Sequence, residues 1–489
     1  MYKSIQYLQE FGIHKFENDF EEFYSDPGKL AEFIINLQKH LNEWGCQMIK
    51  EALETVDLTI KDSHKRKADG YVVDQKEVKK ELITSLGELN YSKTYYYNKL
   101  TNDYCFLVDK VVGLDANDKI TDDALALMYK EAVQTSYRKG GEVMCANSVI
   151  SKQTVKNHLH VLKFPEYEAP TEKRTVKYLY IEADEDHVAK QFNEHKGDLE
   201  VNEWGRKNNC MIEKLVYVHE GVEPVAPKSK RHRLINPHYF CGSSYGCTNK
   251  DFWDKVYQYI EDTYDIDNIE TIYLNADGGN WINEGKDRIG GTKYVLDEFH
   301  LNKYMTKMTS HMLDTAEDAR NELKSAIREG KKKEFKDVVE RLEALASRES
   351  TRKNINVGKE YIETNWEACR LRLKKTDGVI GCSAEGHVSH TLSSRMSSRP
   401  MGWSEVGALK MAQLRAYYLN GGDFLRLAAY QRTQLPMVSG GEGISYEKVL
   451  ADNKPTVKRE WGRYFDAIYT TVPTEVKKYA WLKSHTWLW

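Results

Sequence analysis

The sequence predicts an α+β fold, in which a mixed β-sheet core carries a long α-helical insertion and follows a mainly helical N-terminal region. The first reason is the order of segments: three with strand character are followed by a helical segment and then by another strand. The second is helical spacing from residue 301 to about residue 375, which separates two parts of the core. The third is helical spacing near the N-terminus, as in Leu30, Phe33 and Leu37.

The overall composition indicates a folded chain. It has 489 residues, too many for one ordinary core, and 40% of them are hydrophobic while 30% are charged. The formal net charge of −3 gives no general attraction for nucleic acid, so any DNA-binding surface has to be local. No apolar run of about eighteen residues occurs, and the first residues lack the apolar stretch of a signal peptide. We therefore expect a cytoplasmic protein without a membrane segment.

The eight cysteines do not form a metal-binding or disulfide pattern. They are spread along the chain without a CxxC pair and without the histidine spacing of a zinc site. The nearest pair, Cys241 and Cys247, has no neighbours that would complete a tetrahedral set. We expect free thiols and no structural metal.

The residue patterns divide the chain into six regions. Residues 163–173 hold two prolines and several charges, which is typical of a linker. Residues 76–115 mix β-favouring residues with a glycine turn, which predicts a small hairpin. The expected regions are a helical N-terminal region (1–75), a DNA-binding region with a helix-turn-helix (76–165), the first part of the core (170–300), the α-helical insertion (301–380), the second part of the core (381–430) and a C-terminal tail rich in Trp and Tyr (431–489).

Three short helices are predicted between residues 122 and 162, in the layout of a helix-turn-helix. Ser151 is placed to cap the third helix, whose apolar stripe includes Val155 and Leu159. Away from this stripe lie side chains of the types that reach phosphates and base edges in the DNA major groove: Lys152, Gln153, Lys156 and Asn157. An ordinary helical bundle with a polar outer face explains the pattern equally well.

The core region opens with an irregular order of strands and helices. Strands are predicted at residues 176–183, 211–219 and 231–240, then a helix at 252–264 and a further strand at 271–276. This order is the opening of an RNase H-like mixed sheet. After Gly381, a helix is predicted in the segment SAEGHVSHTLSSRM, and a single further helix from Leu409 to Tyr430.

Two aspartates stand where predicted strands end. The strand in YIEADEDHV delivers Asp184 to its end, and the strand in IYLNADGGNW delivers Asp277 just before a Gly-Gly turn. Side chains at strand ends are held by the sheet yet stay open to solvent, which a divalent-cation site requires. Because side chains alternate along a strand, Glu182, Asp184 and Asp186 share one face, and spacing does not decide among them. Asp184 is chosen by its position.

A third carboxylate has to come from a helix, and Glu385 near the start of SAEGHVSHTLSSRM is the candidate. The competing choices are Glu363, Glu367 and Glu405. Each of these acids is equally well explained as an ordinary surface carboxylate. Arg395 and Arg399, farther along the chain, are candidates for holding DNA phosphates.

Four segments together resemble one known family: IEADEDHV, LNADGGNWI, VLDEFHL and GCSAEGHVSHTLSSRMSSRPMGWS. They are similar to the ISLre-type bacterial insertion-sequence transposases, whose core is similar to that of the Mutator-like transposases. The resemblance covers nearly the whole chain, including GELNYSKTYYY and SKQTVKNHL. It implies a catalytic DDE triad of Asp184, Asp277 and Glu385. VLDEFHL resembles the D-x-x-H signature of Mutator-like enzymes, which implies that Asp297 and His300 support the active site.

The resemblance implies a DNA transposase in which Asp184, Asp277 and Glu385 hold two Mg²⁺ or Mn²⁺ ions. Water would nick the ends of the element, and the freed 3′ hydroxyl would then join target DNA. The expected partners are double-stranded DNA and further copies of this chain, in a homodimer or higher assembly at the nucleoid. The alternatives are a DNA-binding transposase relic that no longer cuts, and an RNase H-like nuclease that cuts without joining.

Overall fold

The computed structural model describes residues 3–114, 118–192, 200–201, 207–434 and 449–450. The described residues up to Asn157, together with those from Phe424 onward, form one unit, and residues 158–423 form a second. The tail expected at residues 431–489 lies almost wholly outside the described residues. All eight cysteines are free thiols, as the sequence predicts. No helix in the described ranges is long and apolar enough to cross a membrane.

The first unit begins with a helical hairpin. Its elements are α1 (Lys3–Tyr7), the π-helical turn η1 (Leu8–Gly12), α2 (Ile13–Ser25), the short turn η2 (Pro27–Lys29), α3 (Leu30–Asp62) and α4 (His64–Ala68). Asp26 turns the chain by accepting a hydrogen bond from the Gly28 N–H at 3.1 Å. The rings of Phe20 and Phe23 then pack on Phe33, each with centroids 5.1 Å apart. The predicted helical start is confirmed.

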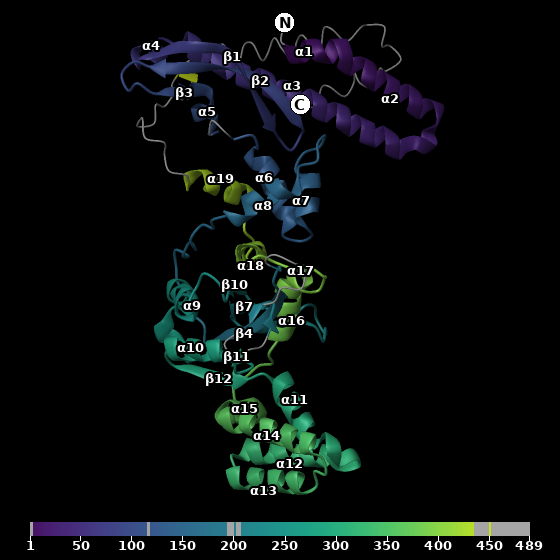
Figure 1. Ribbon diagram of the computed structural model, residues 1–489, viewed down its shortest axis with the longest axis vertical. Coiled ribbons are helices and arrows are strands. Elements are labelled where there is room, and N and C mark those ends of the chain that lie inside the picture. The colour runs from purple at the N-terminus through teal and green to yellow at the C-terminus, as the bar shows by residue number, and fades with distance from the viewer. Residues whose placement is uncertain (1–2, 115–117, 193–199, 202–206, 435–448, 451–489) are drawn as a thin grey trace. The chain divides into compact units, whose positions relative to one another are not determined.

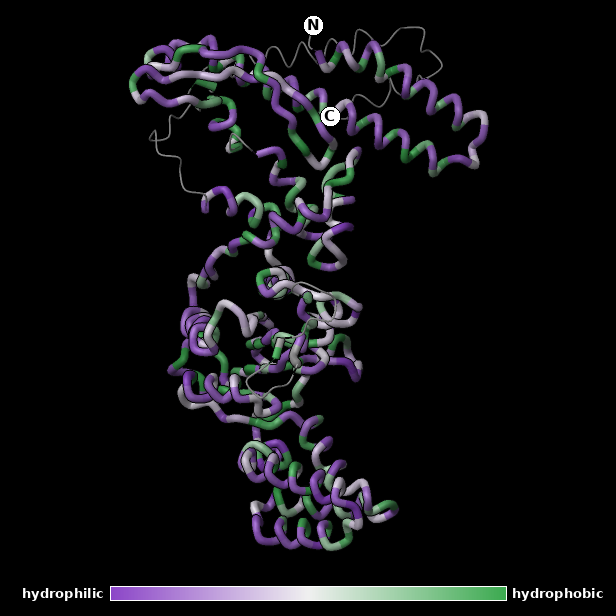
Figure 2. The backbone as a smooth tube through the Cα atoms, viewed as in Figure 1, coloured by the Kyte–Doolittle hydropathy of each residue, from purple (hydrophilic) through white to green (hydrophobic). Residues whose placement is uncertain are grey.

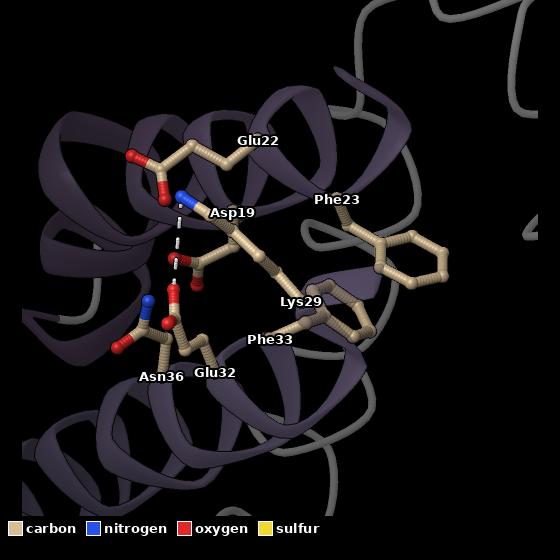
Figure 3. Close-up of a pocket in the computed structure, with 7 residues that line it drawn as sticks. All are labelled: Asp19, Glu22, Phe23, Lys29, Glu32, Phe33 and Asn36. Atoms are coloured by element: carbon tan, nitrogen blue, oxygen red, sulfur yellow. Dashed lines mark ion pairs between the residues drawn. The ribbon is translucent and has the colours of Figure 1, made fainter. Parts of the chain in front are cut away.

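A pocket with mostly polar walls lies between α2 and α3 (Figure 3). Its lining residues are Asp19, Glu22, Phe23, Lys29, Glu32, Phe33 and Asn36. The one ion pair drawn there joins Lys29 to Glu32 at 3.9 Å, and both side chains are about half exposed or more. Such a solvent-exposed pair contributes little to stability.

A curved hairpin follows, formed by β1 (Tyr71–Ile83) and β2 (Glu88–Asn98), with β3 (Tyr104–Phe106) and α5 (Leu107–Val112) beside it. The hairpin was predicted for residues 76–115, but β1 begins five positions earlier, inside the region expected to be helical. Asp109 of α5 is buried against it: Lys80 Nζ lies 3.3 Å from Asp109 Oδ2, Lys93 Nζ also contacts this oxygen, and the Tyr91 hydroxyl donates to Oδ1 at 3.1 Å.

The three short helices expected between residues 122 and 162 are present as α6 (Asp122–Ala132), α7 (Tyr137–Val143) and α8 (Lys152–His160). Ser151 accepts a hydrogen bond from the Thr154 N–H at 3.2 Å, as the predicted cap requires. A fourth helix, α19 (Phe424–Thr433), packs on α6, where Arg432 pairs with Asp122 at 2.6 Å.

The single helix predicted from Leu409 to Tyr430 is two helices, α18 (Glu405–Leu419) and α19. The chain breaks at two consecutive glycines, and Gly421 adopts a φ of +74°, which favours glycine. Residues 424–430 belong to the first unit and not, as expected, to the second part of the core.

The second unit is built on a five-stranded mixed sheet. Its strands are β4 (Tyr178–Ala189), β7 (Cys210–His219), β10 (His238–Ser243), β11 (Thr271–Ala276) and β12 (Thr292–Leu296), in the spatial order β10-β7-β4-β11-β12. β4, β11 and β12 are parallel to one another, whereas β7 is antiparallel to both of its neighbours. Two small ribbons, β5 (Glu200–Val201) with β6 (Lys207–Asn208) and β8 (Val222–Pro224) with β9 (His232–Leu234), lie outside this sheet. The mixed α+β class is confirmed, and β12 is a strand that the sequence analysis did not identify.

The two faces of the sheet differ in chemistry. The face covered by α9 (Asn249–Thr263) and α10 (Asn280–Arg288) is apolar, and Ile181, Val216 and Leu274 pack there against Trp253 (Figure 1). Because side chains alternate along each strand, residues such as Glu182 lie on the opposite face. That face is covered by α16 (Ala384–Val388) and α18, joined through the π turn η5 (Ser389–Ser393) and α17 (Ser394–Met396).

Between β12 and α16 the chain is helical, as the spacing predicts. The helices are α11 (Glu298–Thr309), α12 (Ala316–Glu329), α13 (Lys332–Ala344), α14 (Glu349–Thr364) and α15 (Trp366–Lys374), with the turn η4 (Ser310–Thr315) after α11. The turn η3 (Ile266–Asn268) lies earlier in the chain, between α9 and β11. Hydrophilic and hydrophobic residues alternate along them (Figure 2), and the apolar ones, among them Leu323, Phe335 and Ile355, form a core of their own.

Candidate functional site

Three aspartates stand in a row at the carboxyl edge of the three parallel strands. Ala276 of β11 pairs with Ala183 of β4 on one side and with Leu296 of β12 on the other. The residues one position further along these strands are Asp184, Asp277 and Asp297. Because the three parallel strands are in register, these residues lie side by side, at the level where β11 and β12 end. The Asp297 N–H continues this pairing by donating to the Ala276 carbonyl at 2.9 Å.

Asp184 carries the strongest electrostatic signal of the row. Burial raises the pKa of Asp184 to about 7, and the negative charge of Asp277 acts in the same direction. The Glu185 N–H opposes this by donating to Asp184 Oδ1 at 2.8 Å. β4 does not end at Asp184 but continues to Ala189, because β7 still pairs with it there. Asp184 therefore lies within β4, at the level where the neighbouring strand β11 ends. The prediction that Asp184 stands at the end of its own strand is wrong.

Asp277 occupies a tight turn between β11 and α10. Its Oδ1 accepts a hydrogen bond from the Gly279 N–H at 3.0 Å, and Gly278 adopts a φ of +95° that favours glycine. The Tyr361 hydroxyl of α14 donates to the Asp277 carbonyl oxygen. The Gly-Gly sequence and the insertion helix together fix the direction of this carboxylate. The role of Tyr361 was not visible in the sequence, because it lies 84 positions away.

Asp297 and His300 form a pair at the start of α11. Asp297 caps the helix by accepting from the Phe299 N–H at 3.2 Å, and its Oδ2 lies 3.1 Å from His300 Nδ1. This hydrogen bond raises the pKa of the His300 imidazole above its usual range, and the neighbouring aspartates act in the same direction, against burial. The aspartates around His300 therefore favour the protonated form of its imidazole.

The geometry distinguishes the three acids of β4 that spacing left open. Glu182 is 1% exposed, and its Oε2 accepts hydrogen bonds from the Ser383 N–H at 2.7 Å and from the Tyr217 hydroxyl. Burial alone would raise the pKa of Glu182, but bonds from its partners, chiefly His219, outweigh burial and lower the pKa. Asp186 accepts from the Ser397 hydroxyl at 2.7 Å. Asp184 is the acid whose register places it beside Asp277.

Glu385 lies on α16, above the same face of the sheet, with an exposed side chain. Within the described ranges, no group of three or more His, Cys, Asp and Glu side chains is close enough to hold a metal ion. Of the competing acids, Glu367 pairs with Arg370 at 3.3 Å and Glu405 with Lys190 at 2.9 Å, whereas Glu363 is exposed on α14.

The donor set at the sheet edge fits a divalent cation in part. Asp184 and Asp277 offer carboxylate oxygens, the ligands that Mg²⁺ prefers, and their mutual repulsion is the condition that a bound cation relieves. Across the described part of the chain, no lysine or arginine forms an ion pair with any aspartate of the row. Asp297 is the third carboxylate at this edge, whereas Glu385 is exposed on α16.

The residues expected to contact DNA differ in exposure. Lys152, Gln153, Lys156 and Asn157 are all exposed on α8, while Val155 and Leu159 are buried, so the predicted polar face exists. Arg399 is exposed, but Arg395 is only 4% exposed and its guanidinium lies over the Trp403 ring at 5.0 Å. The geometry gives Arg395 a packing role and does not support the expected phosphate contact.

The fold and the site define an α+β protein with an acidic row at the carboxyl edge of a mixed sheet. Its family model covers residues 26–433, and the chain belongs to UPF0236, an uncharacterised protein family. A UPF0236 protein of Caldanaerobacter subterraneus subsp. tengcongensis is 36% identical over 407 residues, which cover 83% of this chain and 81% of the relative; its name joins eleven loci of that genome. Another UPF0236 protein of the same organism is 37% identical over 395 residues, covering 81% of this chain and 79% of the relative.

Among solved structures, the Drosophila P element transposase strand transfer complex matches 67% of this chain and 83% of its own chain, with 11% identity and a TM-score of 0.23. A TM-score of this size does not establish a common fold.

Proposed function

We propose that the chain is a DNA transposase of an insertion sequence, of the ISLre type, and that Asp184, Asp277 and Glu385 are its catalytic triad. The observation that carries the proposal is the register that sets Asp184 beside Asp277, within the segments that resemble this family. The pKa of Asp184, raised to about 7, supports it, because uncompensated acids cluster at functional sites.

We assign the core to the RNase H-like class. In chain order the five strands are arranged 3-2-1-4-5, with the second one antiparallel. A mixed sheet whose first three strands are followed by the helix α9 and a further strand supports this class, and the acids lie side by side on its first strand and after its fourth and fifth strands. The helices between β12 and α16 correspond to the expected insertion.

The chemistry is two in-line displacements at phosphorus. Bound between the carboxylates, two Mg²⁺ or Mn²⁺ ions would lower the pKa of attacking water and stabilise the leaving oxygen. Asp184 and Asp277, held by strand register and by the Gly279 N–H, supply fixed ligands. In the first displacement, water attacks at the element end and the 3′ oxygen leaves as a hydroxyl. In the second, that hydroxyl attacks a target phosphate, whose own 3′ oxygen leaves. Asp297 fixes the His300 ring, and the neighbouring aspartates favour its protonated form.

The distribution of relatives supports a mobile element. One UPF0236 name joins eleven loci in a single genome. A protein encoded at many places in one chromosome is what repeated insertion of its gene would produce. We therefore extend transposition, with double-stranded DNA and further copies of this chain as partners, to the present chain.

We assign recognition of the element ends to α8. Lys152 and Lys156 are exposed on one side of the helix, where Gln153 and Asn157 bond to each other at 2.9 Å. Replacing both lysines by alanine should weaken binding and reduce the salt slope by about two, since each phosphate contact releases counterions. Fluorescence anisotropy across a salt series would measure this, and an unchanged slope would move end recognition to another region.

The alternative function is a DNA-binding relic without cutting. It is favoured by one observation: Glu385 is exposed, and no three-ligand group exists among the described residues. A single experiment separates the possibilities. The full-length protein is incubated with labelled duplexes from the DNA flanking its own gene, a supercoiled target plasmid and Mg²⁺. Joined products support the transposase, cut ends without joining indicate a nuclease, and bound but intact duplexes indicate the relic.

A further inference from the structure

We infer that Glu182 is a positioning residue, whose buried carboxylate fixes the start of α16 and thereby sets the approach of Glu385 to the Asp184–Asp277 pair. The assignment to catalysis rests on the proposed function, but the fixing of α16 does not. None of the atoms of Glu182 need touch DNA or metal. Its action is through the helix.

The first observation is the contact between Glu182 and Ser383. The Ser383 N–H donates to Glu182 Oε2 at 2.7 Å and the Ser383 hydroxyl donates to the same oxygen at 3.1 Å. Cys382 Sγ lies 3.6 Å from it. The buried carboxylate of Glu182 therefore accepts hydrogen bonds from the residues that come directly before α16, about 200 positions away in the sequence. Hydrogen bonds to an ionised acceptor are the strong ones.

The second observation is that side chains of β7 contact the Glu182 carboxylate. The Tyr217 hydroxyl of β7 donates to Oε2, and His219 Nε2 lies 3.4 Å from Oε1. His219 Nδ1 in turn lies 3.0 Å from the Gly221 carbonyl oxygen. Both partners come from the strand beside β4, and His219 is fully buried. The acceptor that holds α16 is thus fixed by the sheet.

The third observation is a second anchor one turn along the helix. His387 lies against the Tyr217 ring, with centroids 4.5 Å apart, and its Nδ1 is 3.2 Å from the Tyr239 hydroxyl. Tyr217 and Tyr239 belong to β7 and β10. His387 therefore turns toward the β7 side of β4.

These anchors set the direction of Glu385. Residues two apart on an α-helix are separated by about 200° around its axis, so Glu385 and His387 lie on opposite flanks of α16. With His387 against β7 and β10, the opposite flank faces the β11 side, where Asp277 stands. If Glu182 releases Ser383, this rotation is no longer fixed. We call the contact of Glu182 with Ser383 the clamp; together with the His387 anchor it fixes which flank of α16 carries Glu385.

The first test needs neither metal nor DNA. Hydrogen exchange is followed by mass spectrometry in the full-length, metal-free protein, in peptides covering residues 384–392. Glu182→Gln should speed exchange there about tenfold, because the helix start opens locally more often. Glu213→Gln is the matched control: Glu213 is an equally buried acid on β7, bonded to Ser243 at 2.7 Å, and should leave these peptides unchanged.

Unchanged exchange in Glu182→Gln would overturn the inference. If that variant instead loosens the whole sheet, Ser383→Ala takes its place, since it removes only the hydroxyl bonds to Glu182 and Tyr217 and leaves the core intact. It should speed exchange in the same peptides by a smaller factor. No change there would also overturn the inference.

The second test links the clamp to catalysis by a double-mutant cycle on nicking of the labelled flanking duplexes. Glu182→Gln should lower the nicking rate in the wild-type background but have no further effect in a Glu385→Gln background. Equal losses in both backgrounds would show that Glu182 acts by stability alone and overturn the link. If the wild-type protein does not nick at all, the proposed function fails, while the exchange result still decides whether Glu182 holds α16.

Discussion

Each of the two units buries acidic side chains, and they neutralise that charge to different degrees. In the first unit, Asp109 is 2% exposed and is surrounded by two lysine ammonium groups and a tyrosine hydroxyl. In the second unit, three aspartates share the edge of the sheet with one histidine. One acid with two cations is a closed structural cluster. Three acids with one imidazole carry negative charge with which no lysine or arginine among the described residues forms an ion pair.

The difference separates an acid that is paired with lysines from a row that, under the proposed function, would bind metal. A buried ion pair with all its hydrogen bonds is costly to break, yet it has no capacity left for a ligand. An undercompensated row is unfavourable by itself and gains when a cation arrives. The pKa of Asp184 rises to about 7, mainly because the carboxyl is buried, and the charge of Asp277 acts in the same direction.

The largest effect is expected on nicking when the row loses one charge. Asp277→Asn keeps the size of the side chain and its bond from Gly279, but removes the negative oxygen that a hard cation needs. The nicking rate should fall on the order of a thousandfold or more, while affinity for DNA stays within about twofold. The rate is measured on the labelled flanking duplexes with Mg²⁺, and Glu213→Gln serves as the control that should nick normally. Nicking at the wild-type rate would remove Asp277 from the triad.

The same substitution in the closed cluster should act on stability instead. Asp109→Asn leaves the ammonium groups of Lys80 and Lys93, 7% and 3% exposed, without their counter-charge. The loss should be about 3 to 5 kcal/mol of unfolding free energy. Hydrogen exchange of the β1–β2 hairpin in the full-length protein measures it, and the sheet of the second unit is the internal control. If the hairpin were protected from exchange equally well in the variant and in the wild type, Asp109 would not stabilise this cluster.

The sequence predicted the acidic row far better than the closed cluster. The residues 271–276 are a strand as expected, and Asp277 follows it, because an apolar run that ends in a Gly-Gly turn is a local signal. Asp109 meets Lys93 and Lys80 at separations of 16 and 29 positions, with no local pattern to announce it. Strand β12 was missed because its inward-facing residues are few and TKYVL lies between glycines and a helix start.

The direction of Glu385 also lay beyond the sequence. Helical spacing places Glu385 on α16, but which flank it occupies depends on how Glu182 and Tyr217 seat the helix. Those contacts join segments that are 200 and about 170 positions apart in the chain. A motif names the residue types that chemistry requires, whereas the packing between distant segments decides where each one points.

Metal should stabilise the wild-type protein through the row. At a Mg²⁺ concentration ten to a hundred times its dissociation constant, binding to the folded state adds about 1.4 to 2.7 kcal/mol. The melting temperature of the second unit should therefore rise with Mg²⁺ in the wild type and stay level in Asp277→Asn. Scanning calorimetry with and without Mg²⁺ measures both, and Ca²⁺ provides a comparison of cation size. An equal rise in the variant would place the cation elsewhere.

The smallest expected effect is the change of stability with pH in the metal-free protein. Its sign follows from the raised pKa of Asp184. The pKa of this carboxyl is raised from 3.8 to about 7 in the folded state, so between these values the folded protein holds a proton that the unfolded chain has lost. The contribution of Asp184 to stability is therefore present below about pH 4, declines as the pH rises, and is gone above about pH 7.

Between pH 5 and pH 6 the decline should be at most about 1.4 kcal/mol, the linkage of one proton over one pH unit. The Asp184→Asn variant has no carboxyl proton to lose at this position. Its unfolding free energy should therefore fall less than that of the wild type between pH 5 and pH 6, and the difference should equal the contribution of Asp184. Denaturant unfolding of both proteins at the two pH values gives the difference in slope. Glu213, whose pKa is raised to about 8 mainly by burial, contributes a slope of the same sign to both proteins and cancels. Identical slopes would mean that Asp184 is already compensated, and the row would then resemble the Asp109 cluster after all.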